Sequence, residues 1–522
     1  MSAPWRPRHN PWLVAFTVTL ATFMEVLDTA IANVALPHIA GGLSASQNEA
    51  TWVLTSYLVS NAVVLPISAW ISGRVGRKRF YMTCVALFTV SSFLCGFAPT
   101  LPALIFFRVL QGIGGGGLAP SEQAILADTF PPERRGMAFA MYGLAVVFAP
   151  AIGPTLGGYI VDHTTWRWIF YINVPVGIAS LFLSSVMVED PPWLREERER
   201  SRRVNVDWFG LGLVAIAFGS LQVVMDKGQD DDWFSSPFIV VFTMATVICL
   251  LGTLVWEWVH PNPVVNVRLF RRRNFAVSVG LMFTLGAVLY GTTVLLPLFL
   301  QTLMGYSAQG AGEVLSPGGF VTMAMMPLAG FLVSRVPSKY LIAAAFAGMS
   351  LALFHMSSIN LGIDVHTATM YRVYQAVALA FLFIPINTVS YIGIPREQNN
   401  QVSGLMNLAR NIGGSVGIAF VSTILARRSQ VFQSSLVDHA AQSSPLLQER
   451  LAQLQRAFSA AGPAQAMRRA YGALYATIQQ QAAVLSYVHI IEDLAIVCAL
   501  FVPVILLLLK KNDPGAATAG AH

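Results

Sequence analysis

The sequence predicts an all-α integral membrane protein with fourteen transmembrane helices. Of the 522 residues, 55% are hydrophobic and only 11% are charged, and the mean hydropathy is +0.59. Soluble domains carry about 25% charged residues, so this composition excludes an ordinary water-exposed fold. The apolar residues come in runs of about 20, the length that a helix needs to cross the hydrocarbon layer.

The runs define fourteen expected spans in chain order. They lie at roughly 12–36, 50–71, 80–98, 103–126, 138–161, 168–188, 207–225, 237–258, 275–299, 309–334, 339–358, 367–394, 403–426 and 488–509. The tenth is interrupted by Gly and Pro, and the twelfth contains Arg372, so these two carry the weakest signal.

The basic residues lie in alternate loops between these spans. The short loops on one side hold only Arg167 and Lys227. The loops of the other side hold Arg74, Arg77, Lys78, Arg79, Arg134, Arg135, Arg195, Arg198, Arg200, Arg202, Arg203, Arg268, Arg271, Arg272, Arg273, Arg335, Lys339 and Arg396. Because positive residues stay inside, both termini are expected to be cytoplasmic. The net charge of +7 therefore reflects membrane topology, and we expect no nucleic-acid partner.

No cofactor is expected. The four cysteines lie within or beside apolar runs without metal-ligand spacing, and no GxxxxGK[ST] phosphate loop is present. Gly112, Gly114 and Gly117 formally match GxGxxG, but this match interrupts a membrane span. Close helix contact is a better interpretation than nucleotide binding.

An internal repeat divides the chain. Four identities share one offset of 264 residues: Arg108 with Arg372, Gln111 with Gln375, Pro131 with Pro395 and Glu133 with Glu397. Both copies run in the same direction, which is typical of transporters with two parallel halves that rock around a central site. We therefore expect a six-helix half at 1–188, a cytoplasmic linker at 189–206, two inserted helices at 207–258 and a second six-helix half at 259–522.

The segment 428–486 is unusually long for a loop opposite the termini. Leu446, Leu447, Leu451, Leu454 and Phe458 recur at helical spacing, so an amphipathic helix outside the membrane is expected. It forms either a solvated cap or a docking surface for another protein.

Charged residues inside the spans are the main functional candidates, because each costs about 2.5–3.5 kcal/mol at a helix centre. Glu25 and Asp28 share one face of the first span. A buried carboxyl group near another carboxylate holds its proton more readily and can carry it across the membrane. Arg108 cannot plausibly lose its own proton. Its charge can favour the ionised form of a nearby carboxylate when close and the protonated form when withdrawn. The alternative is a fixed ion pair that only holds helices together.

Further candidates are weaker. Glu122 follows Gln111 at nearly the same angular position and could attract cationic substrates; a helix-end carboxylate is the alternative. Arg372 could balance a carboxylate in the second half. Possible substrate contacts are Gln111, Glu122, Tyr142, Phe148, Tyr290, Gln375 and Asn387. For the aromatic residues, ordinary packing is the competing interpretation.

The fifth span contains prolines and glycines that predict two kinks and small packing surfaces, as expected for a helix at a rocking interface. These residues are Pro150, Gly153, Pro154, Gly157 and Gly158.

Several motifs resemble the major facilitator superfamily, and within it the fourteen-span drug:proton antiporters of the EmrB/QacA type. They are "LDTAIANVALP" (27–37), "RVLQGIGGG" (108–116), "APAIGPTLGG" (149–158) and "WRWIFYINVPVG" (166–177). The loop "AWISGRVGRK" (69–78) resembles the superfamily motif G-x-L-x-D-R-x-G-R-K and retains Arg74, Gly76 and Arg77. It has Gly73 in place of the Asp, which puts a conformational latch through that Asp in doubt.

The resemblance implies export of hydrophobic, chemically varied compounds in exchange for protons, with Asp28 as the membrane carboxylate. It also implies a bacterial inner membrane, an EmrA-like periplasmic adaptor that contacts 428–486, and a TolC-type outer-membrane channel. A dedicated exporter of one metabolite, siderophore or fatty acid is the alternative. An enzyme would need a cluster of reactive groups that the sequence lacks, and a purely structural protein would leave the buried charges unexplained.

Overall fold

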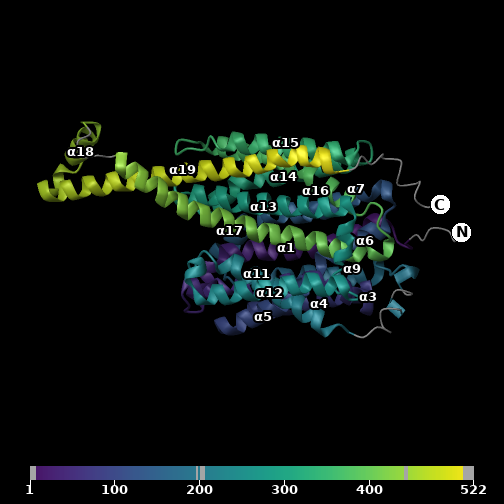
Figure 1. Cartoon of the computed structure of the whole chain (residues 1–522). Helices are drawn as coiled ribbons and strands as arrows, with labels where there is room; N and C mark the ends of the chain where they lie inside the picture. Colours follow the sequence, from purple (N-terminus) through teal and green to yellow (C-terminus); the bar gives the residue numbers. More distant parts are fainter. Residues whose placement is uncertain (1–6, 195–197, 200–205, 440–444, 510–522) are drawn as a thin grey trace.

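The computed structural model describes residues 7–194, 198–199, 206–439 and 445–509. All regular secondary structure in these ranges is helical (Figure 1). Half of the expected linker 189–206, including Arg195, Arg200, Arg202 and Arg203, lies outside the described residues, as does part of 428–486.

The first half of the chain supplies six spans. They are α1 (Pro11–Gly42), α3 (Trp52–Val75), α4 (Arg77–Phe97), α5 with α6 (Leu101–Gly115 and Leu118–Thr129), α7 (Arg135–His163), and α8 with α9 (Trp168–Tyr171 and Asn173–Met187). A short α2 (Gln47–Ala50) precedes α3 and begins with a capping box between Ser46 and Glu49.

The remaining helices follow in the expected order. They are α11 (Trp208–Lys227), α12 (Pro237–Val259), α13 (Arg273–Thr302), α14 (Ala308–Val333), α15 (Ser338–Met356), α16 (Val365–Ser390), α17 (Asn399–His439), α18 (Pro445–Ala457) and α19 (Pro463–Leu508). Thirteen helical segments are long and apolar enough to cross a membrane, and the bent α7 makes a fourteenth. The prediction of fourteen spans is confirmed, including the two with the weakest signal.

Both ends of the described chain lie at one end of the bundle, and α18 lies beyond the other (Figure 1). These two ends are called the terminal side and the hairpin side. Helices α13 to α16 lie together in one part of the bundle, whereas α3 to α5 and the inserted pair α11–α12 lie in the other (Figure 1).

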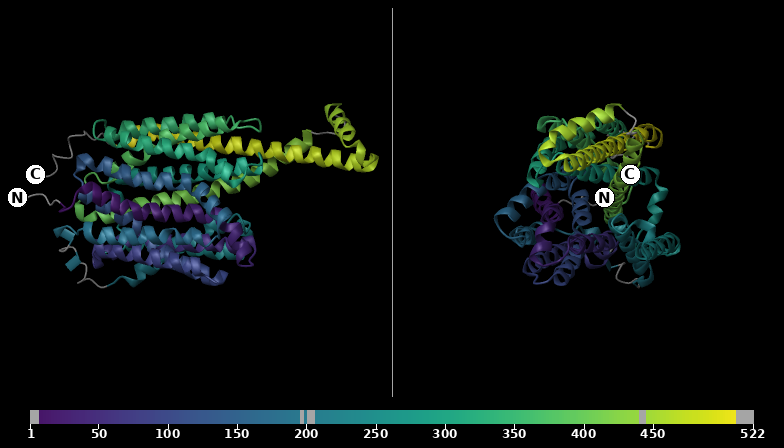
Figure 2. Two further views of the ribbon diagram at one scale, coloured as in Figure 1. Left: turned by 180° about the vertical axis from the view of Figure 1, so that it is seen from behind. Right: turned by 90° about the vertical axis from the view of Figure 1, so that its left-hand side faces the viewer.

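The last two spans are much longer than expected. The run at 403–426 belongs to α17, which continues to His439, and the run at 488–509 belongs to α19, which begins at Pro463. Both helices project past the bundle on the hairpin side (Figure 2). Arg428 of α17 pairs with Asp493 of α19 at 2.8 Å, and Phe432 stacks on His489. The segment 428–486 is thus largely a continuation of two membrane helices.

The predicted amphipathic helix is α18, which packs on α19. Leu447, Leu451, Leu454 and Phe458 are half-buried, whereas Leu446 is 78% exposed. Leu446 therefore does not belong to the packed face that the spacing predicted for it.

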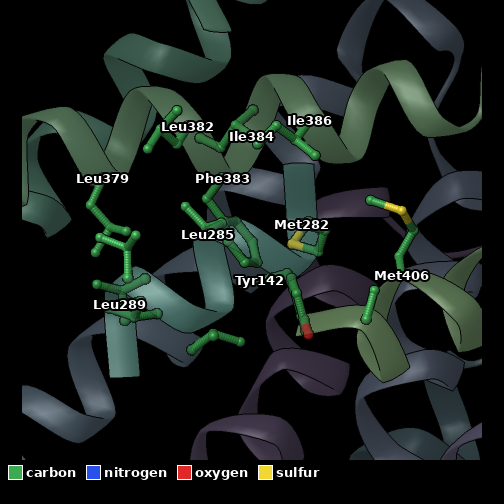
Figure 3. Packing of buried hydrophobic residues seen from close by; sticks show 14 of the residues in the cluster. Tyr142, Met282, Leu285, Leu289, Leu379, Leu382, Phe383, Ile384, Ile386 and Met406 are labelled. Atoms are coloured by element: carbon green, nitrogen blue, oxygen red, sulfur yellow. The ribbon is translucent and has the colours of Figure 1, made fainter. Parts of the chain in front are cut away.

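The two parts of the bundle meet along α7 with α14 and along α3 with α17. Between them, large side chains such as Tyr142, Phe383 and Met406 interlock in a continuous buried cluster (Figure 3). Small residues permit the tightest approaches: a Cβ at Gly330 would lie 3.0 Å from the carbonyl oxygen of Gly136. Such close contact of α14 with α7 brings the polar residues of both halves near one another.

Candidate functional site

Asp28 is the centre of a buried polar cluster in the first half. Its Oδ2 accepts a hydrogen bond from Nη1 of Arg108 at 2.6 Å. Its Oδ1 accepts from Nε2 of Gln111 at 3.0 Å and from Nδ2 of Asn173 at 2.7 Å. Both oxygens of this 2% exposed residue are therefore satisfied in the charged form.

Arg108 is held as firmly as its partner. Its Nη1 also donates to Oε1 of Gln111 at 2.9 Å, and its Nε donates to the carbonyl oxygen of Val53 at 3.0 Å. The guanidinium lies over the ring of Tyr57, 4.4 Å from the centroid. Its Nη2 is buried without a hydrogen-bond partner among the described residues. The cation thus remains available to a second acceptor if the cluster rearranges.

Local sequence explains how the helices meet here. Arg108 and Gln111 are three residues apart and lie on one face of α5. The glycines that follow allow close packing: a Cβ at Gly112 would lie 2.0 Å from Oγ of Ser60, and one at Gly114 would lie 2.7 Å from the backbone N of Phe88. The glycine run therefore serves helix contact, as the sequence predicted.

Glu25 lies outside the Asp28 cluster. One oxygen accepts hydrogen bonds from Nδ2 of Asn61 at 3.1 Å and from the hydroxyl of Tyr57 at 3.3 Å. The other oxygen is buried and has no partner among the described residues. The two carboxylates of α1 therefore occupy different environments, one paired with a cation and one held by neutral donors.

Glu122 is completely buried on α6. Its Oε1 accepts a hydrogen bond from the hydroxyl of Thr19 at 2.6 Å, and its Oε2 has no partner within the described chain. A two-residue turn separates it from Gln111, since α5 ends at Gly115 and α6 begins at Leu118. Glu122 is the fifth residue of α6.

A second polar network joins the two halves. Gln123 of α6 donates to Oδ1 of Asn387 on α16 at 3.3 Å and accepts from Nδ2 of Asn407 on α17 at 2.9 Å. Tyr142 of α7 donates its hydroxyl hydrogen to Oδ1 of Asn407 at 2.8 Å and accepts from Nη1 of Arg410 at 2.7 Å. All five side chains are buried, so the halves meet here through directional bonds.

Arg410 is the charged member of this network and was missed by the sequence analysis. It is 4% exposed, and within the described chain no carboxylate lies within 4 Å of it. Among the described residues, its hydrogen-bond partner is the hydroxyl of Tyr142. The cost of a charge inside an expected span could have identified it, as it identified Arg108.

Arg372, the repeat counterpart of Arg108, has no carboxylate partner among the described residues. It donates from Nη1 to Oε1 of Gln375 at 2.7 Å and from Nη2 to the hydroxyl of Thr293 at 3.2 Å. Gln375 in turn donates to the hydroxyl of Thr292 at 2.6 Å. The expectation of a balancing carboxylate is wrong, since hydroxyl and amide oxygens take that place.

The aromatic candidates differ in their surroundings. Tyr142 is buried and stacks on Phe383 with 5.7 Å between ring centroids (Figure 3). Phe148 of α7 is half-buried and meets Phe320 of α14 edge-on at 5.4 Å. Tyr290 is half-buried and lies against Gly414 of α17. Phe148 and Tyr290 are the more accessible of the three.

A series of contacts that begins at the junction of α3 and α4 connects the halves on the terminal side. Gly76 has φ +103°, a conformation that favours glycine, and Arg74 stacks over Trp70. Arg77 is buried in an ion pair with Asp128 of α6, whose other oxygen accepts from Nδ2 of Asn399 on α17 at 2.7 Å. Asp128 therefore links Arg77 to α17 without a carboxylate at position 73.

The fifth span is α7, which bends by 45° between Arg135–Pro150 and Ile152–His163. Its small residues face different neighbours. A Cβ at Gly153 would lie 2.4 Å from Cβ of Ala30, and one at Gly157 would lie 3.1 Å from Cγ2 of Ile31, so both pack on α1 of the same half. Pro154 instead lies beside Gly312 of α14, and a Cβ at Gly158 would meet nothing within 4 Å. Of these four residues, Pro154 is the one placed at the contact between halves.

Comparisons with known proteins agree with this architecture. Residues 18–418 match the Major Facilitator Superfamily model. The chain is 36% identical over 454 residues to "Multidrug export protein EmrB" of Escherichia coli (strain K12), covering 86% of this chain and 87% of that protein. It is 34% identical to "Fatty acid resistance protein FarB" of Neisseria gonorrhoeae over 98% of this chain and 97% of that one.

A solved structure of the proton:xylose symporter XylE superposes with a TM-score of 0.60 at 17% identity, covering 98% of this chain and 99% of that chain. This likeness bears on the fold alone. Together with the family match and the membrane-spanning helices, it shows that the chain belongs to the major facilitator superfamily and is a multi-pass membrane transporter, not an enzyme.

Proposed function

We propose that this transporter exports hydrophobic, chemically varied compounds in exchange for protons. The observation that carries the proposal is Asp28, a fully buried carboxylate whose charge is held by Arg108, Gln111 and Asn173 within the membrane bundle. The names of relatives that are multidrug export and fatty acid resistance proteins support the export assignment.

The chemistry follows from the ion pair. A proton that reaches Asp28 neutralises it and weakens its attraction to Arg108, which already has a buried N–H group without a partner. The helices α1 and α5 are then free to separate or tilt, and loss of the proton restores the pair. In this scheme Arg108 controls the proton site and carries no proton itself. A proton moving inward releases about 2.3 kcal/mol per 100 mV of membrane potential, which can drive export.

Glu25 and Arg410 connect proton occupancy to the relative position of the halves. Glu25 belongs to α1 of the first half, whereas Arg410 belongs to α17 of the second, and opposite charges on the two halves would attract each other through the buried interior. Movement of one half against the other changes this attraction, so the protonation of Glu25 depends on conformation. Glu122 belongs to the same group of carboxylates and would respond in the same direction.

The setting that we propose is a bacterial inner membrane, with the terminal side cytoplasmic and the hairpin side periplasmic. The basic loops on the terminal side support this orientation. We propose that the projecting parts of α17 and α19 with α18 contact an EmrA-like periplasmic adaptor that leads to a TolC-type channel. No cofactor is needed, because the proton gradient supplies the energy.

A dedicated exporter of fatty acids is the second candidate. It is favoured by the similarity to FarB, which extends over nearly the whole of both chains.

Export by the purified protein in proteoliposomes tests the proposal. With an imposed pH gradient, we expect transport of a lipophilic cation, a neutral dye and a medium-chain fatty acid. Transport of the fatty acid alone would favour the dedicated exporter. Asp28→Asn should abolish gradient-driven export while leaving folding intact. Asp364→Asn, which changes an exposed helix cap, is the matched control. Undiminished export by Asp28→Asn would refute proton carriage at this residue.

A further inference from the structure

The inserted helix α11 makes polar contacts with both halves of the transporter. On one side it faces the beginning of α3: Asp226 accepts a hydrogen bond from the hydroxyl of Thr55, and Lys227 donates to the hydroxyl of Thr51. The ammonium group of Lys227 also lies 5.5 Å from the ring centroid of Trp52. These contacts join α11 to the first half through two charged side chains.

On its other side α11 reaches α17. Oε1 of Gln222 accepts a hydrogen bond from the hydroxyl of Ser415 at 2.9 Å. Nε1 of Trp233, in the turn after α11, donates to the hydroxyl of Thr423 at 3.2 Å. Only neutral groups take part in these two bonds, so each is weaker than a bond to a charged group.

The backbone around Trp233 is held in an unfavourable conformation. Asp232 and Trp233 are consecutive non-glycine residues with φ of +55° and +50°. The turn is closed by a 2.6 Å hydrogen bond from the backbone N of Trp233 to the carbonyl oxygen of Gly228, and the indole packs on Gly228. This strained turn directs the indole N–H to α17 and to Gln229, which accepts at 3.2 Å.

The bonds from α11 to α3 and to α17 together form a bridge between the halves. The position of this bridge along the membrane determines which side of the transporter it can hold closed. Towards the terminal side, α3 and α17 touch directly: a Cβ at Gly404 would lie 3.6 Å from the carbonyl oxygen of Leu65. The bridge through α11 lies nearer the hairpin side, because Thr51, Thr55 and Thr423 belong to the hairpin-side parts of their helices. When the halves separate on the hairpin side, α11 cannot keep both sets of bonds.

We propose that α11 moves with the first half and that Gln222 and Trp233 are positioning residues, whose bonds to Ser415 and Thr423 hold the hairpin side closed. The charged contacts with α3 persist during the movement, while the two neutral bonds to α17 break and re-form. The inserted pair thereby contributes to the conformational equilibrium of the transport cycle, and the inference does not depend on which compound is exported.

Spin labels at Pro99→Cys, in a hairpin-side loop of the first half, and His366→Cys, in the first turn of α16, measure the separation by double electron–electron resonance. Gln222→Leu and Trp233→Phe should each lower the ratio of closed to open molecules about threefold, and the double variant about ninefold, as expected for independent hydrogen bonds between membrane helices. Trp208→Phe, which changes an exposed tryptophan of the same helix, is the control and should leave the ratio unchanged.

Ser415→Ala and Thr423→Ala remove the same bonds from the α17 side and provide the test if either α11 variant fails to fold. Cross-linking α11 to α3 should leave transport intact, whereas cross-linking α11 to α17 should block it. Unchanged distance distributions in all four hydrogen-bond variants would overturn the proposal, as would continued transport with α11 fixed to α17. The distance measurement needs no substrate or proton gradient, so its outcome is separate from that of the proposed export function.

Discussion

The two halves carry the same arginine–glutamine pair in different electrostatic surroundings. Arg108 and Arg372 each donate Nη1 to a glutamine three residues later, at 2.9 and 2.7 Å. The repeat offset places Thr292 at the position of Asp28, and the structure agrees, since Gln111 donates to Asp28 as Gln375 donates to Thr292. One half thus contains a buried ion pair, and the other contains the same framework without the acid.

The helix caps show the reverse distribution of charge. Thr100 caps α5 in the first half, whereas Asp364, at the same repeat offset, caps α16 in the second. The first half therefore has its acid at the centre and a neutral cap at the edge, and the second half has the opposite. The arginine and glutamine are thus common to both halves, whereas the buried acid beside them is present at position 28 and replaced by a hydroxyl at position 292.

Replacement of the buried arginines should reveal the largest functional difference between the two halves. Arg108→Gln leaves Asp28 as an uncompensated buried charge, a cost of about 3–5 kcal/mol, so export should fall about 100-fold. Arg410→Gln loses a charge-assisted bond of about 1.5–3 kcal/mol, and about a tenfold fall is expected. Arg372→Gln likewise loses charge-assisted bonds, to Gln375 and Thr293, but it leaves no buried carboxylate uncompensated, so about a tenfold fall is expected there too.

Initial export rates in proteoliposomes check this order, with Arg108→Lys as the conservative variant and size-exclusion profiles as the measure of folding. An equal loss in Arg108→Gln and Arg372→Gln would mean that the two halves are functionally equivalent, contrary to the comparison.

Thr292→Asp should give the second half an ion pair of its own. The new carboxylate would lie at the position equivalent to Asp28 and pair with Arg372, whose charge is now balanced only by neutral oxygens. We expect the free energy of unfolding to rise by up to about 1–3 kcal/mol near neutral pH. Thermal unfolding in detergent measures the change, and Thr293→Asp is a matched variant one residue away. A lower stability would show that the surroundings of Arg372 cannot accept an anion.

The bond between Gln123 and Asn387 joins equivalent positions of the two halves, since they too are 264 residues apart. Gln123→Ala also removes the bond to Asn407, so it should weaken the contact between halves more than Asn387→Ala does. The expected effects are about tenfold and about threefold on the ratio of molecules closed on the terminal side to molecules open there. Distance measurements between labelled halves would show them, and a double-mutant cycle would separate the shared bond. Equal effects would mean that the Asn407 bond contributes nothing.

The smallest expected effect is a difference in how the stabilisation by the two helix caps, Thr100 and Asp364, depends on pH. Hydrogen bonds from the hydroxyl and the backbone N–H of Thr367 hold the pKa of Asp364 below its ordinary value. Its capping contribution is therefore complete above about pH 4 and is lost as the pH falls below that range. The stability difference between wild type and Asp364→Ala should shrink on acidification, whereas that for Thr100→Ala should not change. Thermal unfolding from pH 3 to 7 tests this, and parallel curves would contradict it.

Much of the architecture could be predicted from the sequence, because the bilayer imposes a length and a polarity on every span. The same rule identified Asp28, Arg108 and the repeat. The long helices α17 and α19 could not be predicted, since their projecting parts are polar and resemble a loop when apolar runs are sought.

The partners of the buried charges depend on tertiary contacts that no single stretch reveals. Asn173 reaches Asp28 from 145 residues away, and Asn399 reaches Asp128 from 271 residues away. Both are neutral amides, which carry little signal inside polar or motif-rich segments. Arg410, in contrast, has a recognisable sequence signal, since it is a charged residue inside an expected span.

The uninterrupted course of α17 has a mechanical consequence. At 1.5 Å per residue its 41 residues extend about 60 Å, roughly twice the thickness of the hydrocarbon layer. A tilt of about 10° around the middle of the membrane would carry the far end sideways by about 8 Å, much farther than any atom near Arg410 would move. The helix is thus a stiff lever arm, able to report events at the centre of the bundle to whatever touches its tip.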